Sequence, residues 1–308
     1  MTQPSPAMNR NLVGVVSLCA GVLVFSAQDA ILKGLSGSHA VTLAIMLRSV
    51  VGLPILFAMV WAEKGPQALR TKNWKLLVAR GLILLTSYTT YYMAFPALPL
   101  AEAVALFFTS PIFVTILAAL FLREKVTLKA WGAVIAGFVG VLIILRPGTG
   151  LFEPAALLSL FSAAAYALSM VLARRYSADE PTTVMAFYVN AVYMVAAAGV
   201  ALAFHLLGVT HAAHPSLEFL VRPWAVPDLR DLLLMGLCGV IAALGMTLLT
   251  HAYRLARANL VTVFEYTGMF WVPLWGFLFF AEIPRWTTVT GTVIIIAAGI
   301  FAVRNSKA

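Results

Sequence analysis

The sequence repeats one apolar pattern, first in residues 94–146 and again in residues 252–304. Each copy has an apolar run that ends near a Glu, followed by a second apolar run with spaced glycines. At an offset of 158–159 residues, the matching positions are Glu124 and Glu282, Gly132 and Gly291, Gly140 and Gly299, and Arg146 and Arg304. An internal repeat in an almost wholly hydrophobic chain is typical of secondary transporters, so the sequence predicts a membrane protein built from two related halves.

The composition argues against a water-soluble protein. Of the 308 residues, 62% are hydrophobic and 11% are charged, whereas soluble domains carry about 25% charged residues. We therefore expect the lipid bilayer to surround the chain. The net charge of +9 is attributed to cytoplasmic loops, because no basic run with interleaved aromatic residues indicates nucleic-acid binding. The two cysteines, Cys19 and Cys238, lie in apolar runs and predict neither a disulfide nor a metal cluster.

Apolar runs of about 20 residues, long enough to cross the hydrocarbon core, recur along the chain. They predict an all-α integral membrane protein with ten transmembrane helices in two inverted five-helix repeats, residues 1–148 and 149–308. Because five is an odd number, the second repeat enters the membrane from the side opposite to the first. The predicted spans are 12–34, 40–61, 74–95, 100–122, 129–146, 152–173, 183–207, 229–253, 258–280 and 286–303.

The distribution of Lys and Arg predicts the orientation. With the N-terminus inside, 15 basic residues, Arg80 among them, fall in inner regions and five fall in outer regions. Cytoplasmic loops of membrane proteins are enriched in Lys and Arg, so we expect both termini to be cytoplasmic. The longest link, residues 208–228, is interpreted as an extramembrane loop.

Three segments resemble the EamA-type branch of the drug/metabolite transporter superfamily. They read FSAQDAILKGLSGSHAVTLAIMLRSVVG, LFLREKVTLKAWGAVIAGFVGVLIIL and LFFAEIPRWTTVTGTVIIIAAGIF. In the first segment an Asp and a Lys precede an Arg of the next span. The second half has no clear copy of this set, although Arg174, Arg175 and Asn190 lie near the corresponding positions. The resemblance covers residues 12–304 and implies a multi-pass transporter of small organic solutes in the bacterial inner membrane, with a central cavity between the halves.

Glu265 is the first candidate for a functional residue. It lies about seven residues into the predicted span 258–280 and has no basic neighbour in the sequence. Ionisable groups inside the membrane are costly and tend to face cavities or partners, so Glu265 is a candidate to bind a proton or a cationic group of the substrate. The alternative is a protonated Glu that is hydrogen-bonded to a neighbouring helix.

Asp29 and Arg48 fall at similar depths in two consecutive predicted spans. The favoured interpretation is a structural ion pair in which each charge neutralises the other. The alternative is a binding site for an anionic group at Arg48, with Asp29 as its gating partner. Lys33, one helical turn beyond Asp29, is expected to extend toward the outer interface and anchor the helix there.

A polar run, residues 86–92, interrupts the third predicted span. Tyr88 and Tyr92 are four residues apart and share one helix face, which suits the stacking of a flat solute. The alternative is an aromatic belt at the outer membrane interface, which fits Tyr91 and Tyr92 better than Tyr88. Weaker candidates in the second half are Tyr166, Ser169 and Asn190.

Two further features are interpreted as structural. Glu124 and Glu282 each end a predicted span and are expected to cap the start of the following helix. Gly132 and Gly140 share one helix face, and Gly291 lies in the second copy of that pattern, so these glycines are expected to allow close helix packing.

The leading hypothesis is a secondary transporter that works by alternating access and exports a small amphipathic or amino-acid-like metabolite, with a proton as a possible coupled ion. Import of a cofactor-like solute, such as riboflavin or S-adenosylmethionine, is the alternative that the resemblance implies. The sequence contains no GxxxxGK[ST] motif for ATP hydrolysis and no HExxH or GxSxG motif, so we do not expect an enzyme. A channel remains a further alternative. No cofactor or metal site is expected, and the sequence does not indicate an oligomeric state.

Overall fold

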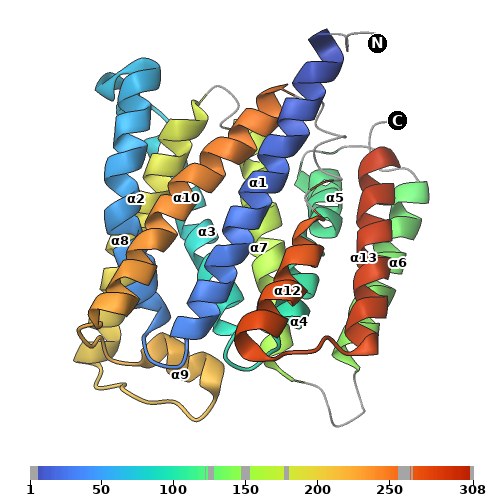
Figure 1. Ribbon diagram of the computed structural model, residues 1–308. Coiled ribbons are helices and arrows are strands. Elements are labelled where there is room, and N and C mark those ends of the chain that lie inside the picture. Colours follow the sequence, from blue (N-terminus) through green and yellow to red (C-terminus); the bar gives the residue numbers. More distant parts are fainter. Residues whose placement is uncertain are drawn as a thin grey trace.

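The computed structural model describes residues 6–121, 123, 128–146, 153–176, 180–255, 264 and 266–305. Across these residues the regular secondary structure is helical, and the long helices run roughly side by side between two ends of the molecule (Figure 1). Helix α1 begins and helix α13 ends at the same end, drawn at the top of Figure 1. We call that end the upper end and the opposite one the lower end.

Each predicted span overlaps a described helix, but the bounds differ by up to ten residues, since α12 is described only from Gly268 in the predicted span 258–280. Two short helices, η1 (Pro66–Leu69) and α9 (Pro215–Val221), lie in the links between long helices. The others are α1 (Pro6–Leu35), α2 (Val41–Lys64), α3 (Trp74–Met93), α4 (Leu100–Phe107), α5 (Ser110–Phe121), α6 (Leu128–Leu145), α7 (Ala155–Tyr176), α8 (Thr182–Leu206), α10 (Leu229–Leu255), α12 (Gly268–Phe280) and α13 (Trp286–Asn305).

Six helical stretches of the described chain are long and apolar enough to cross a membrane. They are Leu12–Leu35, Val41–Lys64, Leu100–Phe121, Ala155–Leu172, Thr182–Leu206 and Leu229–Leu249. The shorter apolar helices are Val134–Leu145, Gly268–Phe280 and Trp286–Phe301. Helix α3 is not among them because Arg80 and the polar residues 86–92 lower its mean hydropathy.

The predicted span 100–122 is not one continuous helix. It divides into α4 and α5 at Phe108 and Thr109, which form a turn. Pro111 favours this break, because it has no backbone N–H to bond the carbonyl of Phe107. Proline alone does not enforce a break, since α2 and α12 continue through Pro54 and Pro273. At the break the Thr109 hydroxyl donates to the Leu106 carbonyl at 2.6 Å. Such broken helices occur in transporters where the backbone lines a cavity.

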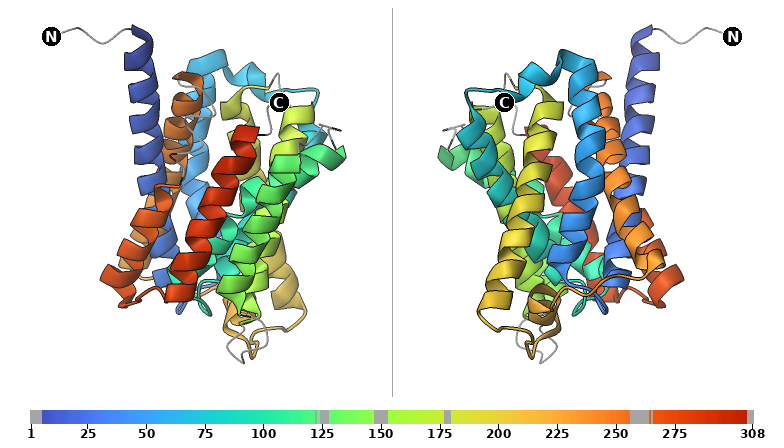
Figure 2. Two further views of the ribbon diagram at one scale, coloured as in Figure 1. Left: turned by 90° about the vertical axis from the view of Figure 1, so that its right-hand side faces the viewer. Right: turned by 90° about the vertical axis from the view of Figure 1, so that its left-hand side faces the viewer.

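The most extensive helix contacts join the two halves of the sequence. Helix α13 packs along α6, α1 along α10, α2 along α8 and α3 along α7. Each pair combines a helix from residues 6–146 with a helix from residues 153–305, and Figure 2 shows α13 running beside α6 on one side of the molecule. The two halves therefore interleave and share one apolar core.

Glycine allows one of these pairs to approach closely, as the sequence predicts. A Cβ atom on Gly140 of α6 would lie 2.8 Å from the carbonyl oxygen of Gly291 on α13, and one on Gly291 would lie 2.6 Å from the carbonyl oxygen of Gly140. Larger residues would separate these backbones. The prediction is wrong for Gly132, because a Cβ there would meet nothing within 4 Å.

Candidate functional site

A cavity of about 380 Å³ lies inside the bundle. Its walls come from α1, α2, α3, α4 and the start of α5 in the first half and from α7, α8, α10 and α12 in the second half. Most of the lining is apolar or aromatic, with a small number of polar groups, as is usual for binding sites of small molecules. Its polar and charged residues are Ser26, Gln28, Asp29, Arg48, Arg80, Ser87, Ser110, Ser162 and Asn190, together with six tyrosines.

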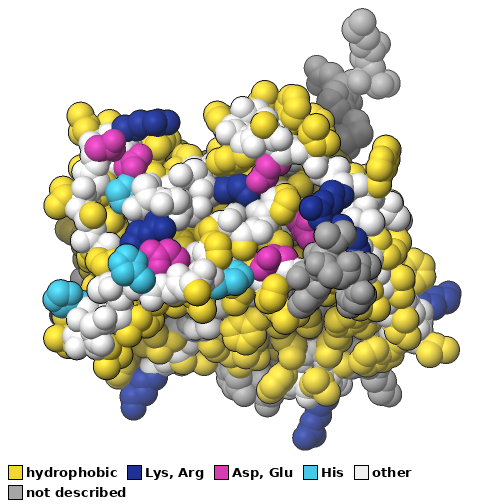
Figure 3. Space-filling model, turned by 90° about the horizontal axis from the view of Figure 1, so that it is seen from below, with side chains coloured by type: hydrophobic (Ala, Val, Ile, Leu, Met, Phe, Trp, Pro, Cys, Tyr) yellow, Lys and Arg dark blue, Asp and Glu magenta, His cyan; other side chains and the backbone are white. Residues whose placement is uncertain are grey.

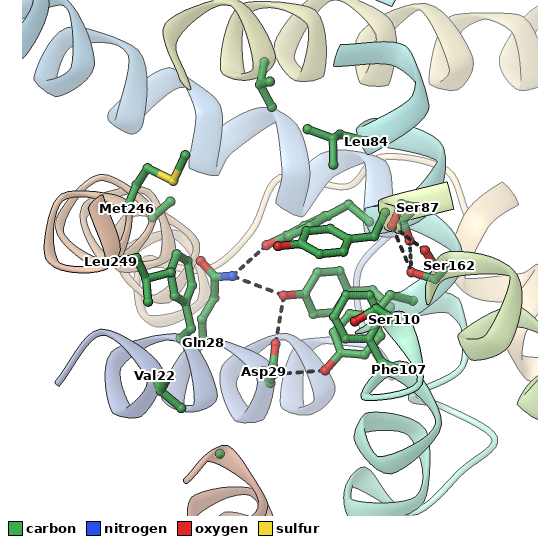
Figure 4. Close-up of a pocket in the computed structure, with 18 of the residues that line it drawn as sticks. Val22, Gln28, Asp29, Leu84, Ser87, Phe107, Ser110, Ser162, Met246 and Leu249 are labelled. Carbon is green, nitrogen blue, oxygen red and sulfur yellow. Dashed lines mark hydrogen bonds between the residues drawn. The ribbon is translucent and has the colours of Figure 1, made fainter. Parts of the chain in front are cut away.

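Asp29 is held by tyrosines of α3. The hydroxyl of Tyr91 donates to one carboxylate oxygen of Asp29 at 3.0 Å, and the hydroxyl of Tyr92 donates to the other at 2.9 Å. The side-chain amide of Gln28 donates to Tyr88 at 2.6 Å and to Tyr92 at 3.1 Å (Figure 4). Positions 88, 91 and 92 share one helix face, which explains why three tyrosines reach the same two residues of α1.

Arg48 contacts aromatic rings. Its guanidinium carbon lies 4.3 Å from the ring centroid of Tyr88 and 5.7 Å from that of Tyr193. No Asp29 oxygen lies within 4.0 Å of its nitrogens, so the predicted ion pair between Asp29 and Arg48 is not formed. Both residues line the same cavity, but tyrosine hydroxyls satisfy the carboxylate and tyrosine faces hold the cation.

Arg80 is a cavity residue, although it was counted from the sequence among the basic residues of the inner regions. It lies in the second turn of α3, its side chain is 6% exposed, and it lines the cavity near Tyr166 and Tyr193. The signal was present in the sequence, because Arg80 stands between apolar residues of a predicted span. Removing it from the inner regions leaves 14 basic residues there against five outside, so the bias persists.

The tyrosines of α3 do not form an interfacial belt. Tyr91 is 7% exposed and Tyr92 is 1% exposed, and both belong to the buried core. Tyr88 packs against Tyr92 with ring centroids 4.3 Å apart and against Tyr193 at 5.5 Å. The predicted shared face of Tyr88 and Tyr92 is therefore present, and it faces the interior of the bundle.

The candidates of the second half divide into two groups. Asn190 and Tyr166 line the cavity, whereas Ser169 is buried outside the lining. The Asn190 amide donates to the Ala186 carbonyl at 3.0 Å, and its own oxygen has no hydrogen-bond partner within the described part of the chain. On the wall between α3 and α7, Ser87 donates to the Ser162 carbonyl at 2.8 Å (Figure 4).

Two of the sequence-predicted residues, Glu265 and Glu124, lie outside the described residues. Glu282 is described, and its predicted role needs correction. Its carboxylate accepts the backbone N–H of Leu100 at 2.8 Å, so it caps α4 of the other half and not the following helix α13. Its second oxygen pairs with Lys33 at 2.6 Å.

Lys33 also differs from its prediction. Its side chain is 11% exposed, and besides Glu282 it donates to the carbonyls of Phe95 at 3.2 Å and Leu98 at 2.6 Å. It therefore turns inward and ties α1 to the α3–α4 link and to the α12–α13 link. On α1 the cavity lining runs from Val22 to Asp29 and stops one turn short of Lys33.

Further polar contacts join the two halves at the lower end. His39 lies 2.6 Å from Asp231, Arg222 donates to the Ser36 carbonyl at 3.1 Å, and Trp224 donates to Thr42 at 2.8 Å. Figure 3 shows acidic, basic and histidine side chains gathered on this face. Together with Lys33 and Glu282, these contacts join the two halves at the lower end, below the cavity.

Apolar helices around a shared, partly polar cavity with broken α4–α5 define the class of a membrane transporter. The sequence profile of the EamA-like transporter family matches the chain twice, over residues 12–146 and 153–304. The chain belongs to this family and is a membrane-embedded, multi-pass protein.

Curated relatives span nearly the whole chain. The pseudopaline exporter CntI of Pseudomonas aeruginosa PAO1 is 27% identical over 296 residues, which cover 96% of this chain and 97% of the relative. The S-adenosylmethionine uptake transporter of Rickettsia felis is 25% identical, with 98% and 96% covered. The riboflavin transporter of Rhizobium johnstonii is 28% identical, with 99% and 96% covered. This chain is accordingly a transporter of small metabolites.

One solved crystal structure has the same fold. The alignment covers 97% of this chain and 98% of the solved chain, with a TM-score of 0.63 and 19% sequence identity. At that identity the likeness concerns the fold alone.

Proposed function

We propose that the chain is a secondary transporter that moves a small organic metabolite across the bacterial inner membrane by alternating access, with export as the expected direction. The observation that carries the proposal is the cavity between helices of both halves, with contacts that join those halves at the lower end. A site between two halves must open toward one side at a time for a solute to pass without a leak.

The two transport units are residues 1–148 and 149–308, five helices each and inverted relative to one another. The packing supports this assignment. We match α1 with α7, α2 with α8, α3 with α10 and α6 with α13; a contact between two helices then has an equivalent between their matched partners. The pair α1–α10 then corresponds to α7–α3, and α2–α10 corresponds to α8–α3. The pairs α2–α8 and α6–α13 correspond to themselves. The twofold match of the family profile agrees with the same division.

The upper end faces the cytoplasm in this proposal. Helices α1 and α13 have their terminal ends there, and the Lys and Arg bias places both termini on the cytoplasmic side. The lower end is then the periplasmic face. Its contacts between the halves would have to break when the cavity opens outward, while the upper end closes.

The substrate is proposed to be amino-acid-like or otherwise amphipathic. The apolar and aromatic walls offer contact surfaces for the body of the solute, and Gln28, Asp29, Arg48 and Asn190 supply polar contacts. Export follows the pseudopaline exporter among the relatives. Import of a cofactor-like solute is the second candidate, because two other relatives are named for S-adenosylmethionine uptake and for riboflavin.

Coupling to a proton is also part of the proposal. Asp29 is a carboxylate in the described lining of the cavity. The hydrogen bonds that Tyr91 and Tyr92 donate to it can form or break as the carboxylate loses or gains a proton. Glu265 keeps its role as a second candidate on sequence grounds alone. A transport cycle of this kind needs no covalent chemistry, so no enzymatic activity is proposed.

The decisive experiment is a metabolite comparison. Medium and cell extracts from a deletion strain, an overexpressing strain and a strain that carries an inactive variant should differ in one group of related compounds. Each compound found should then be transported by purified protein in liposomes, with a rate that saturates. A rate that rises without saturation would indicate a channel, and chemical turnover without a gradient would indicate an enzyme.

A further inference from the structure

The charges inside the cavity do not balance. Among the lining residues that the structure describes, the formally charged ones are Asp29, Arg48 and Arg80. With Asp29 ionised, two cations face one anion, and that anion already accepts hydrogen bonds from Tyr91 and Tyr92. One positive charge therefore lacks a counter-charge within the described walls.

Both arginines are buried and incompletely hydrogen-bonded. Each side chain is 6% exposed. The Nε and Nη1 atoms of Arg48 and the Nε atom of Arg80 have no hydrogen-bond partner among the described residues. A buried guanidinium that keeps its charge without an anion is costly in a membrane, and such groups usually mark substrate pathways.

The surrounding tyrosines hold these cations without neutralising them. Arg48 stacks on the faces of Tyr88 and Tyr193, which leaves the N–H groups in the plane of its guanidinium free to point elsewhere. Arg80 interacts electrostatically with Tyr193 and Tyr166, so Tyr193 is shared by the two cations. Tyr88 accepts a hydrogen bond from Gln28, and its own hydroxyl hydrogen remains available to an acceptor in the cavity.

We propose that Arg48 and Arg80 together bind the carboxylate of the solute, so that the transported compounds are organic carboxylates with an apolar or aromatic body. This inference rests on the proposed transport function and specifies its substrate class. A planar carboxylate matches the fork of a guanidinium, and its single negative charge equals the excess positive charge of the described lining. The apolar body would lie against the aromatic and aliphatic walls.

The test compares carboxylates with their neutral amides. Full-length protein in detergent is titrated with benzoate, phenylacetate and N-acetylphenylalanine, and with the primary amide of each, while the thermal unfolding temperature is recorded. The carboxylates are expected to raise this temperature and the amides are not. Phenyl phosphate is included because a phosphate ester is the other common anion for arginine.

Variants identify the site. Arg48→Gln and Arg80→Gln should each raise the half-saturating carboxylate concentration by about tenfold or more, since each removes charged hydrogen-bond donors. Arg48→Lys keeps the charge but loses the fork, and it should fall between the wild type and Arg48→Gln. The matched control is Arg230→Gln, which removes an exposed Arg at the lower end and should change nothing. Monodisperse elution from a sizing column verifies that each variant is folded.

Equal stabilisation by acids and amides would overturn the inference, as would unchanged carboxylate binding in both glutamine variants. Stabilisation by phenyl phosphate alone, or by none of the anions, would also overturn it. The proposed transport function is tested by a separate result. If liposomes move neutral or cationic metabolites, transport stands and the carboxylate assignment fails, whereas a protein that moves no metabolite removes the transport proposal itself.

Discussion

Lys33 and Glu282 meet at 2.6 Å beneath the cavity, although 249 positions separate them in the sequence. One is at the lower end of α1 and the other is in the link between α12 and α13. Glu282 also caps α4 through the N–H of Leu100, and Lys33 also binds the carbonyls of Phe95 and Leu98. Four segments are thus joined at one point, so we expect an outward opening to break this pair.

Removing one member of this pair should favour the outward-open state. Glu282→Gln leaves Lys33 without its anion and weakens the contacts at the lower end by about 1–3 kcal/mol. The measurement is the rate at which a membrane-impermeant, negatively charged thiol reagent modifies a Ser162→Cys probe in the cavity, with Cys19 and Cys238 replaced by serine. Reagent added at the periplasmic face should react at least several times faster in the Glu282→Gln protein.

Lys33→Met should produce the same acceleration, and Arg230→Gln should not. If neither Lys33→Met nor Glu282→Gln changes the labelling rate, the pair is a fixed structural contact and the lower end opens elsewhere.

The Tyr92 hydroxyl connects Asp29 with Gln28, so Tyr92→Phe should disrupt both. The change leaves Asp29 with Tyr91 as its hydroxyl donor and should reduce the transport rate about tenfold, for a loss of about 1–3 kcal/mol. Transport by purified protein in liposomes is the measurement. Thr86→Val is the control, since Thr86 lies on the exposed side of the same helix and donates to the Leu82 carbonyl of its own helix. Similar losses in the two variants would mean that the effect is a general weakening of α3.

Asp29→Asn tests proton coupling. If Asp29 takes up and releases the coupled proton, the neutral amide should make the transport rate independent of an imposed pH gradient while the protein remains folded. The measurement is substrate flux in liposomes with and without that gradient. A variant that retains the full response to the gradient would exclude Asp29 as the proton carrier and leave Glu265 to be tested in the same way.

The contact of α6 with α13 predicts two destabilising substitutions. Gly140→Ala and Gly291→Ala each place a methyl group against a backbone carbonyl of the facing helix, at 2.8 and 2.6 Å. Each should lower the free energy of unfolding by about 1–3 kcal/mol through overpacking, visible as a lower unfolding temperature in detergent. Gly132→Ala on the same helix meets no atom within 4 Å and should be neutral or slightly stabilising. Equal effects at positions 132 and 140 would refute the close contact.

The extramembrane segment that contains α9 should loosen in acid. Glu218 accepts the backbone N–H of Ala212 at 2.8 Å and lies 3.5 Å from His211 and 3.6 Å from Arg222. The hydrogen bond from Ala212, with smaller contributions from His211 and Arg222, lowers the pKa of Glu218 below its usual value of 4.5. The stabilisation is therefore complete above that value and is lost as the pH falls through the lowered pKa.

Hydrogen exchange of peptides from residues 208–228 should show this acid-dependent loss of protection, after correction for the intrinsic rate. Glu218→Gln should lower the protection already at neutral pH and remove its dependence on pH. Acid loosening that persists unchanged in this variant would assign the effect to another group.

The approximate positions of the helices were readable from local sequence. Each predicted span overlaps a described helix, because hydropathy over about 20 residues depends on composition and not on the neighbours in space. The close glycine contact between α6 and α13 was also readable, since small residues at helical spacing allow close packing in lipid. The break between α4 and α5 was not predicted, because a proline alone does not mark one: α2 and α12 continue through Pro54 and Pro273.

The sequence by itself determined that Asp29, Arg48 and Tyr88 belong to membrane helices and are too polar to face lipid. Only the tertiary structure decided that Asp29 binds tyrosines, that Arg48 stacks on Tyr88, and that Arg80 faces the same cavity. The reason is that the partner of a side chain depends on how each helix is rotated and paired. Rotation and pairing are set by packing between helices that are far apart in the sequence, and the hydropathy of a segment does not depend on that packing.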